Sequence, residues 1–180
     1  LPSERPLPLF LGQEFSVRGQ ALATLRRRSG DNLLVVGERN GARFGMLASA
    51  VMSAALVTPP AGLKVWMCDR TAEGAPSSDL LPAVAEALSA AGYESACVRQ
   101  PEDLATLLGL VESIVEYRRG LNADQMAHEP SIIVVINEPD RVPALARISD
   151  AYGSVETELG GRLREVLVAG PPIGVHVLMG

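Results

Sequence analysis

The sequence predicts an α/β domain with a mostly parallel sheet and helices on both of its faces. Aliphatic runs typical of buried strands alternate with segments of roughly 12 to 18 residues at helical spacing, which is the order of βαβ units. Hydrophobic residues make up 47% of the chain and aromatic residues only 4%, and such aliphatic cores suit parallel sheets covered by helices. The 180 residues fit a single domain, residues 1–180, since single domains run to roughly 100–200 residues.

Residues 1–30 are expected to form a strand hairpin that leads into the domain. Residues 7–15 and 21–27 have strand-like patterns, and a loop around Arg18 and Gly19 separates them.

Residues 32–37 form the first strand that the sequence predicts to be buried on both faces. Four consecutive apolar residues end at Gly37, and such continuous runs are typical of strands covered on both sides. Residues 43–56 then favour a helix, because they are rich in Ala, Met and Leu and contain no Pro. The next strand, residues 63–68, ends at Asp69, at the edge where polar groups of doubly wound sheets usually meet ligands.

The middle of the chain supplies two further helices and a short strand. Residues 79–91 are expected to form a helix that Asp79 caps. Residues 95–99 form the strand, and Pro101 then begins a helix that Gly120 ends. The apolar face of this second helix is built from Leu104, Leu107, Leu108, Val111, Ile114 and Val115.

The last third of the chain contains the strongest strand signal, the aliphatic run at residues 132–136. A helix follows whose apolar face carries Leu159, Leu163, Val166 and Leu167. Residues 174–180 then read as a buried strand with nothing after it. We therefore expect the native domain to be truncated at residue 180 and the chain to be a fragment of a longer one.

The charge of the chain argues against broad binding to polyanions. The net charge of −5 and the pI near 5.1 give the domain as a whole no electrostatic attraction to nucleic acid or anionic membranes. The only compact basic run is residues 26–28, and a solvated charged turn is favoured over a phosphate-contacting patch. No apolar run reaches the ~20 residues that span a bilayer, so we expect a cytoplasmic protein with no direct membrane insertion.

The cysteines and histidines do not form a metal-binding pattern. Cys68 and Cys97 lie in apolar stretches, where a thiol usually behaves as a small buried hydrophobe, and we expect both to be reduced. His128 and His176 stand alone, and the four residues lack the spacing of a zinc site. We expect His128 on the surface and His176 within a strand.

A candidate phosphate-binding loop follows the first buried strand. A strand that ends at Gly37, a loop containing Gly41 and a helix start form the geometry that points backbone N–H groups at a phosphate. A glycine at this turn is also common for tight packing alone, so the loop is weak evidence by itself. The dinucleotide fingerprint G-x-G-x-x-G is excluded, because Gly37, Gly41 and Gly45 recur at every fourth position.

The P-loop pattern G-x-x-x-x-G-K-[ST] matches this loop only at its first position. Gly37 stands at the first glycine and Ala42 at the second. Arg43 stands at the lysine, which reaches the β- and γ-phosphates in a working loop, and Phe44 at the Ser or Thr, whose hydroxyl binds Mg²⁺. Arg43 keeps a positive charge in a different shape, whereas Phe44 offers no ligand.

The second half of such a site is an aliphatic strand that ends in Asp-Glu, where Asp holds the hydrated Mg²⁺ and Glu orients the attacking water. Here the strand is followed by Asn137 and Glu138. A neutral amide is a poorer partner than a carboxylate for a hard dication. Glu138 is the retained candidate catalytic residue, although an isolated Glu at a strand end is more often a surface or capping residue.

The order of elements over residues 7–179 resembles the motor domain of the FtsK/SpoIIIE translocases, in the FtsK–HerA superfamily. Residues 32–37 look like the family's first strand and loop, and residues 64–69 like its second strand ending in Asp. Residues 116–119 look like the Glu-x-x-Arg-Arg helix end ahead of the Walker B strand, one residue shorter here. Residues 170–178 are similar to the family's G-R-x-x-G-I-H segment and the strand after it.

This resemblance implies a RecA-like P-loop NTPase fold with three layers, the use of ATP and Mg²⁺, and assembly into a hexameric ring. Family members move double-stranded DNA, and relatives in type VII secretion help to move secreted protein substrates. The implied partners are other motor modules or ring subunits. The secretion relatives carry several motor-like modules in one chain, some with degenerate sites.

The sequence supports three functional hypotheses. The first is a degenerate FtsK/SpoIIIE-like ATPase module, impaired in ATP hydrolysis, with a structural or regulatory role in a DNA-translocase or type VII secretion-like assembly. The second is an active ATP-dependent DNA translocase domain in which Arg43 and Glu138 suffice with unusual nucleotide ligation. The third is a non-catalytic α/β binding module. Phe44 and Asn137 favour the first, because together they remove both protein contacts to magnesium.

Overall fold

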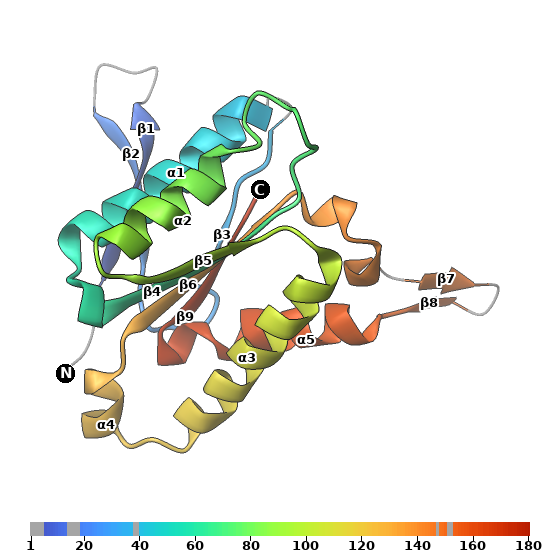
Figure 1. Ribbon diagram of the computed structural model, residues 1–180. Coiled ribbons are helices and arrows are strands. Elements are labelled where there is room, and N and C mark those ends of the chain that lie inside the picture. Colours follow the sequence, from blue (N-terminus) through green and yellow to red (C-terminus); the bar gives the residue numbers. More distant parts are fainter. Residues whose placement is uncertain (1–5, 14–18, 38–39, 147, 151–152) are drawn as a thin grey trace.

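A parallel sheet forms the centre of the computed structural model, which describes residues 6–13, 19–37, 40–146, 148–150 and 153–180. In these residues the sheet has five strands in the order β3-β9-β6-β4-β5 (Figure 1). Their bounds are β3 Leu33–Leu34, β4 Leu63–Asp69, β5 Glu94–Val98, β6 Ser131–Asn137 and β9 Val175–Met179.

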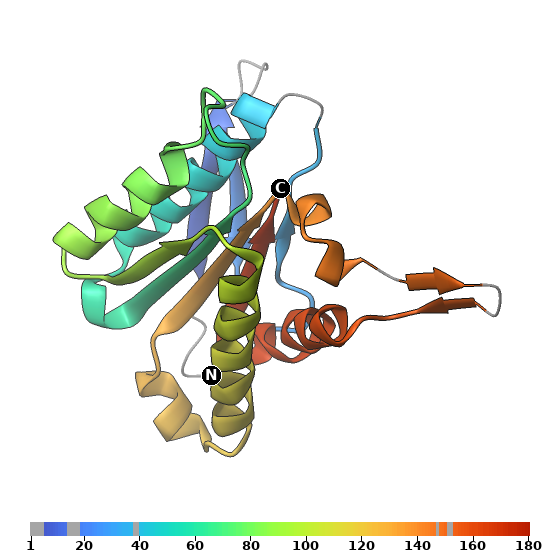
Figure 2. The ribbon, with the colours of Figure 1, turned by 45° about the vertical axis from the view of Figure 1, so that its right-hand side comes forward.

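Helices cover both faces of this sheet (Figures 1 and 2). α1 and α2 pack on one face, and α3 and α5 on the other. Their bounds are α1 Asn40–Val57, α2 Leu80–Ala90, α3 Pro101–Arg119 and α5 Glu158–Ala169. Successive side chains of a strand point to opposite faces, so Val135 joins the α1–α2 core and Val134 the α3–α5 core. The predicted three-layer α/β fold is confirmed.

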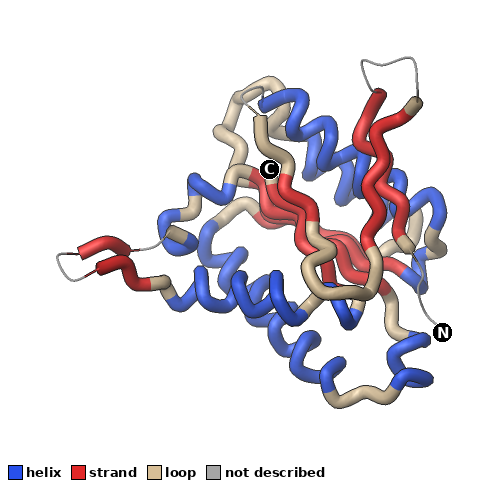
Figure 3. Tube along the Cα trace, turned by 180° about the vertical axis from the view of Figure 1, so that it is seen from behind, coloured by secondary structure: helices blue, strands red, loops and turns tan. Residues whose placement is uncertain are grey.

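The N-terminal strands form a separate antiparallel hairpin beside α1 (Figure 3). β1 is Leu7–Gln13 and β2 is Gln20–Leu25. The backbone N–H of Phe10 donates to Ser53 Oγ in α1 at 2.8 Å. The loop expected around Arg18 falls partly on residues 14–18, which lie outside the described residues.

The predicted strand at residues 32–37 is much shorter than expected and is not buried on both faces. β3 contains only two residues, and Val35 N–H adds one further bond to Met179 O at 2.8 Å. Leu34 is 62% exposed and Val36 is 83% exposed. The reason is position, because β3 pairs only with β9 and lies at the edge of the described sheet. An apolar run is typical of a central strand but does not distinguish it from an edge strand.

The start of α2 also differs from the expectation. Asp79 is the residue before the helix, but its side chain makes no capping hydrogen bond with the described residues. Its backbone has φ −103° and ψ 0°, whereas a capping residue normally has extended backbone that lets the side-chain oxygen reach the first free N–H groups.

Short elements complete the fold. α4, Ala123–His128, begins with a capping box between Asn122 and Gln125, and its last residue is exposed, as expected for His128. β7, Ile148–Asp150, and β8, Gly153–Val155, form a hairpin that projects from the body of the domain (Figure 2). The sequence patterns contain no periodicity long enough to predict β7 or β8.

The basic run after β2 is a charged turn in which one arginine has a structural role. Arg28 Nε lies 2.7 Å from Asp31 Oδ1, as the predicted solvated turn requires. Arg27 instead donates from Nη1 to the carbonyl of Met126 at 2.6 Å and from Nη2 to that of Glu129 at 2.7 Å. These contacts fix the turn against the end of α4, where the Met126 carbonyl also accepts the backbone N–H of Glu129 at 3.2 Å.

Both cysteines are free, which confirms the sequence-based expectation. In the β4–β5 ladder Cys97 pairs with Met67 and Cys68 pairs with Val98. The two thiols therefore point to opposite faces of the sheet. Burial raises the pKa of Cys68 to about 11 and that of Cys97 to about 12.

Neither thiol is expected to react appreciably with iodoacetamide in the folded protein at neutral pH. The thiolate is the nucleophile, and the raised pKa values keep Cys68 and Cys97 protonated. Mass spectrometry should show an unmodified chain after alkylation in native buffer and two modified cysteines after alkylation in denaturant. Cys68 is buried and Cys97 is half-buried, so rapid native alkylation of Cys97 would contradict the raised pKa of its thiol.

Candidate functional site

Residues from distant parts of the chain meet at the carboxyl edge of the sheet, where β4, β6 and β9 end near the start of α1. The backbone N–H of Glu138 donates to Gly180 O at 2.6 Å and so ties the residue after β6 to the residue after β9. Asp69 and Asn137 are register partners at the ends of β4 and β6. Open α/β sheets usually bind ligands at this edge, which makes these residues the candidate site.

Asn137 is fully buried and held by two neighbours. Its Nδ2 donates to Asp69 Oδ1 and to Thr71 Oγ1, each at 2.9 Å. Asp69 is buried as well, and its Oδ1 also accepts the backbone N–H of Thr71 at 3.0 Å and the Thr71 hydroxyl. Asn137, which stands where the motif has the aspartate of its Asp-Glu pair, therefore completes a buried polar triad. Its amide donates to the carboxylate of Asp69.

The carboxylate of Glu138 lies between two arginines. Its Oε2 is 2.8 Å from Arg141 Nε, and its Oε1 is 3.6 Å from Arg43 Nη2. The residue is 4% exposed and has a left-handed backbone with φ 53°, which is uncommon for residues other than glycine and often marks functional sites. The guanidinium groups of Arg43 and Arg141 therefore neutralise the Glu138 carboxylate, which is the one acidic side chain retained from the Asp-Glu pair.

Arg43 reaches Glu138 from the beginning of α1. Its aliphatic stem packs on the end of β9, because a Cβ at Gly180 would lie 3.0 Å from Arg43 Cγ and 2.9 Å from Leu47 Cδ1. The next residue, Phe44, is only 1% exposed. The ring at the Ser/Thr position of the motif thus belongs to the interior of the protein.

The other residues of the candidate phosphate loop are exposed. Gly37 lies in the loop after β3, and Gly41 and Ala42 lie in the first turn of α1. A Cβ at Gly37 or Gly41 would meet no described atom within 4 Å, so tight packing does not explain either glycine. Residues 38 and 39 of this loop lie outside the described residues.

The structure brings three of the sequence-predicted site residues together: Arg43, Asn137 and Glu138. It adds Thr71 and Arg141, which the sequence did not single out. Thr71 could have been inferred, because it follows Asp69 at the end of a neighbouring strand. Arg141 carries no comparable signal, since its position depends on the 3₁₀ turn Pro139–Arg141 that bends back onto the strand end.

Two hollows adjoin these residues. One, of about 400 Å³, is bordered by Gly41, Phe44 and Glu138. The other, of about 390 Å³, is more polar and lies at the ends of β4 and β5. Thr71 and Arg141 border both hollows, so the Glu138–Arg141 ion pair stands beside each of them.

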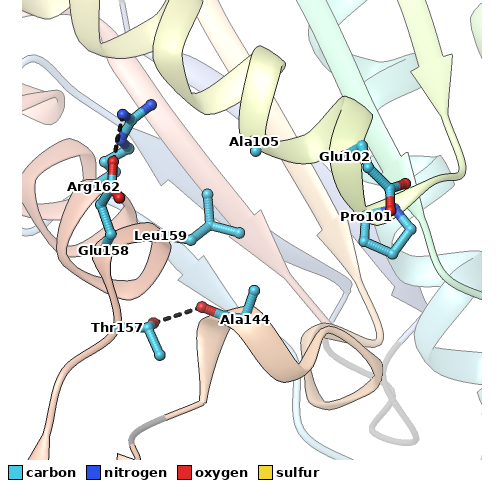
Figure 4. Close-up of a pocket in the computed structure, with 8 residues that line it drawn as sticks. All are labelled: Pro101, Glu102, Ala105, Ala144, Thr157, Glu158, Leu159 and Arg162. Atoms are coloured by element: carbon cyan, nitrogen blue, oxygen red, sulfur yellow. Dashed lines mark hydrogen bonds and ion pairs between the residues drawn. The ribbon is translucent and has the colours of Figure 1, made fainter.

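A third hollow, of about 510 Å³, lies between the first turns of α3 and α5 (Figure 4). Its wall is mainly apolar and includes Pro101, Ala105 and Leu159. Arg162 Nη2 is paired with Glu158 Oε1 at 2.8 Å, so two of the three charged side chains at its border satisfy each other, and Glu102 is the third. This hollow is an apolar groove and not a continuation of the candidate site.

The residues at the carboxyl edge do not fit a magnesium-bound nucleotide of the usual P-loop kind. Mg²⁺ requires oxygen ligands, but Phe44 presents only carbon. Asn137 donates from its amide nitrogen to Asp69 and Thr71 and leaves only a neutral amide oxygen where the motif has a carboxylate. Glu138 is already paired with two guanidinium groups. Within the described ranges, no group of three or more His, Cys, Asp and Glu side chains is arranged to hold a metal ion.

Solved structures of known proteins share this fold, although no family model and no curated protein matches the sequence. The cytoplasmic domain of the Thermomonospora curvata type VII secretion ATPase EccC matches with a TM-score of 0.63 and 17% identity, over 99% of this chain and 19% of that one. The cytoplasmic domain of EssC matches with a TM-score of 0.65 and 12% identity, over 96% and 32%. The pCW3 conjugation coupling protein TcpA, in a monomer form with ATPγS, matches with a TM-score of 0.61 and 16% identity, over 99% and 49%.

The chain therefore has the fold of the FtsK/SpoIIIE-type ATPase domains, and it spans between 19% and 49% of the length of these three chains. Identities this low show the fold and leave the chemistry to the residues of the site. Among the helices described, none is long and apolar enough to cross a membrane.

Proposed function

We propose that this chain is a degenerate FtsK/SpoIIIE-type ATPase module that does not hydrolyse ATP and has a structural or regulatory role in a translocation assembly. The observation that carries the proposal is the state of the metal-site positions. Phe44 is part of the interior, the Asn137 amide donates to a buried carboxylate, and Glu138 lies between two arginines.

Hydrolysis would require these contacts to be broken. A catalytic carboxylate orients the attacking water by a direct hydrogen bond, and Glu138 could do so only after its ion pairs with Arg43 and Arg141 opened. Arg43, at the lysine position, already contributes its charge to that ion pair. Phe44 supplies no oxygen ligand, and Asn137 offers a neutral amide oxygen, which is a poorer ligand for magnesium than a carboxylate.

A role within a larger assembly is supported by the lengths of the similar proteins. The chain covers only 19% of the EccC chain and 32% of the EssC chain, both of which are cytoplasmic domains. We infer a cytoplasmic module whose partners are neighbouring motor modules or ring subunits. A secreted protein is a better cargo than double-stranded DNA for this module, because the net charge is −5 and Arg27 is engaged with backbone carbonyls.

Incubation of the chain with Mg-ATP is expected to release no phosphate above the background of the buffer. The measurement is continuous phosphate release by wild type, by Glu138→Gln and by Glu86→Gln, in which an exposed acid outside the site is neutralised. All three proteins should give the same baseline. Saturable turnover that disappears in Glu138→Gln and persists in Glu86→Gln would instead establish the active translocase with unusual nucleotide ligation.

A further inference from the structure

The polar hollow of about 390 Å³ at the carboxyl ends of β4 and β5 is lined in part by residues that the proposed function does not use. Its lining includes Arg70, Arg99 and Gln100, together with the acidic residues Asp69 and Glu73. Of the described residues of the candidate phosphate loop, none lines this hollow. The hollow shares Asp69, Thr71 and Arg141 with the candidate site, but Arg99 and Gln100 extend it towards the end of β5.

Two arginines of this hollow differ from most arginines of the chain. Most described arginines form an ion pair with a carboxylate: Arg28, Arg43, Arg118, Arg119, Arg141, Arg162 and Arg164. Arg70 and Arg99 form none with any residue described. Arg70 Nη1 donates to the backbone carbonyl of Arg99, while the covered Arg70 Nε has no hydrogen-bond partner. The Arg99 guanidinium is half-buried and makes no hydrogen bond in the described structure.

The acidic residues of the hollow do not compensate these charges. Asp69 Oδ1 accepts hydrogen bonds from Thr71 and Asn137, and neither Asp69 nor Glu73 forms an ion pair with the described arginines. Glu73 is exposed. Arg70 and Arg99 thus border one hollow without forming an ion pair with its acidic residues, and leaving a partly buried charge unpaired is unfavourable. A bound anion would pair with both guanidinium groups, against the repulsion of the buried Asp69 carboxylate, whose Oδ2 has no hydrogen-bond partner among the described residues.

The beginning of α3 adds a weaker attraction for an anion. Gln100 precedes the 19-residue helix and makes no side-chain capping bond to the described residues, and Pro101 occupies its first turn. The free N–H groups and the helix dipole at such a terminus favour negative charge. Glu102 and Asp103 in the same turn are exposed and oppose this effect, so the two arginines remain the main determinants.

We propose that this hollow binds the phosphoryl group of a small ligand through Arg70 and Arg99. A phosphoryl dianion matches two guanidinium groups in charge, and each planar fork can donate two parallel hydrogen bonds to its oxygens. A volume of about 390 Å³ is at the small end of ligand pockets, which run to roughly 300–1,000 Å³. The ligand is accordingly inorganic phosphate, pyrophosphate or the phosphate end of a nucleotide.

Calorimetric titration with pyrophosphate, without magnesium and at constant ionic strength, tests this proposal. We compare wild type with Arg99→Gln, which removes a side chain that has no described bond, and with Arg164→Gln, which removes the same charge from an exposed side chain on α5. Arg99→Gln should weaken binding about tenfold or more, as the loss of charge-assisted hydrogen bonds predicts, whereas Arg164→Gln should bind like wild type. Arg99→Lys should bind with intermediate affinity, because it keeps the charge without the fork.

ADP and adenosine distinguish the possible sources of the phosphoryl group. Binding of ADP that is as sensitive to Arg99→Gln as binding of pyrophosphate assigns the pocket to nucleotides as well, while adenosine alone should not bind. Equal losses in Arg99→Gln and Arg164→Gln would reveal a general charge effect and overturn the proposal. Loss of binding in Arg43→Gln alone would place the anion at α1 and also overturn it. Because magnesium and hydrolysis are absent from these titrations, their outcome is independent of the phosphate-release experiment.

Discussion

Replacing Asn137 by aspartate is expected to lower the free energy of unfolding by about 3–5 kcal/mol at pH 8, the range measured when a buried charge is left uncompensated. Asn137 Nδ2 lies 2.9 Å from Asp69 Oδ1, and both residues are buried. The substitution exchanges this hydrogen-bond donor for a second carboxylate at the same distance. Two carboxylates so close cannot both ionise without strong repulsion.

The destabilisation should depend on pH in a defined direction. Repulsion and burial raise the pKa of the introduced carboxyl group in the folded state above its value in the unfolded chain, near 3.9. The folded state then binds more protons, so stability falls as pH rises. The penalty is absent below the unfolded pKa and complete above the raised folded pKa. Urea unfolding of both proteins at pH 5 and pH 8 should therefore show a larger difference at pH 8.

A charge-swapped variant provides the matched control for this experiment. Asp69→Asn combined with Asn137→Asp restores one carboxylate and one amide at the pair of strand ends, so it should recover most of the lost stability at pH 8. Equal free energies of unfolding for wild type and Asn137→Asp at both pH values would show that the Asp69–Asn137 hydrogen bond does not stabilise the fold. The proposed function would then lose the support of the Asn137 amide as a donor to a buried carboxylate.

The fold class could be predicted from the sequence because the strongest patterns belong to long, regular strands and helices. The run at residues 132–136 became the centre of β6, and the apolar spacing after Pro101 became the buried face of α3. The strand predicted at residues 32–37 was too long, because an apolar run does not indicate that the strand has a neighbour on one side only. The hairpin β7–β8 was missed because three-residue strands carry no measurable periodicity.

The site could be predicted only as far as a motif fixes positions in the chain. Motif matching selected Arg43 and Glu138, but it gave no reason for them to form an ion pair. That contact depends on how the ends of β6 and β9 place Glu138 against α1, which is a tertiary property. The second arginine, Arg141, depends on a 3₁₀ turn. The sequence thus led to the prediction that Phe44 and Asn137 are poor magnesium contacts, and the structure shows the contacts that these residues make.

Replacing Phe44 by threonine is expected to lower the free energy of unfolding by about 3–5 kcal/mol, as for other truncations of buried aromatic rings. Phe44 is 1% exposed, so the substitution removes most of a buried ring and leaves a hydroxyl group in its place. Leu56→Thr on the same helix is the matched control, because Leu56 is 83% exposed and surface changes usually remain within about 0.5 kcal/mol. Urea unfolding monitored by circular dichroism measures both values.

The outcome decides whether the missing hydroxyl is a local defect or part of the fold. If Phe44→Thr is as stable as Leu56→Thr, the ring position is adaptable and the hydroxyl of a working phosphate loop could return at no cost to the fold. A large loss confined to Phe44→Thr means that the interior now depends on the aromatic ring. Together with the repulsion expected at Asn137, such a loss would mean that restoring either magnesium contact destabilises the domain. This result is expected of a module that is not selected for ATP hydrolysis.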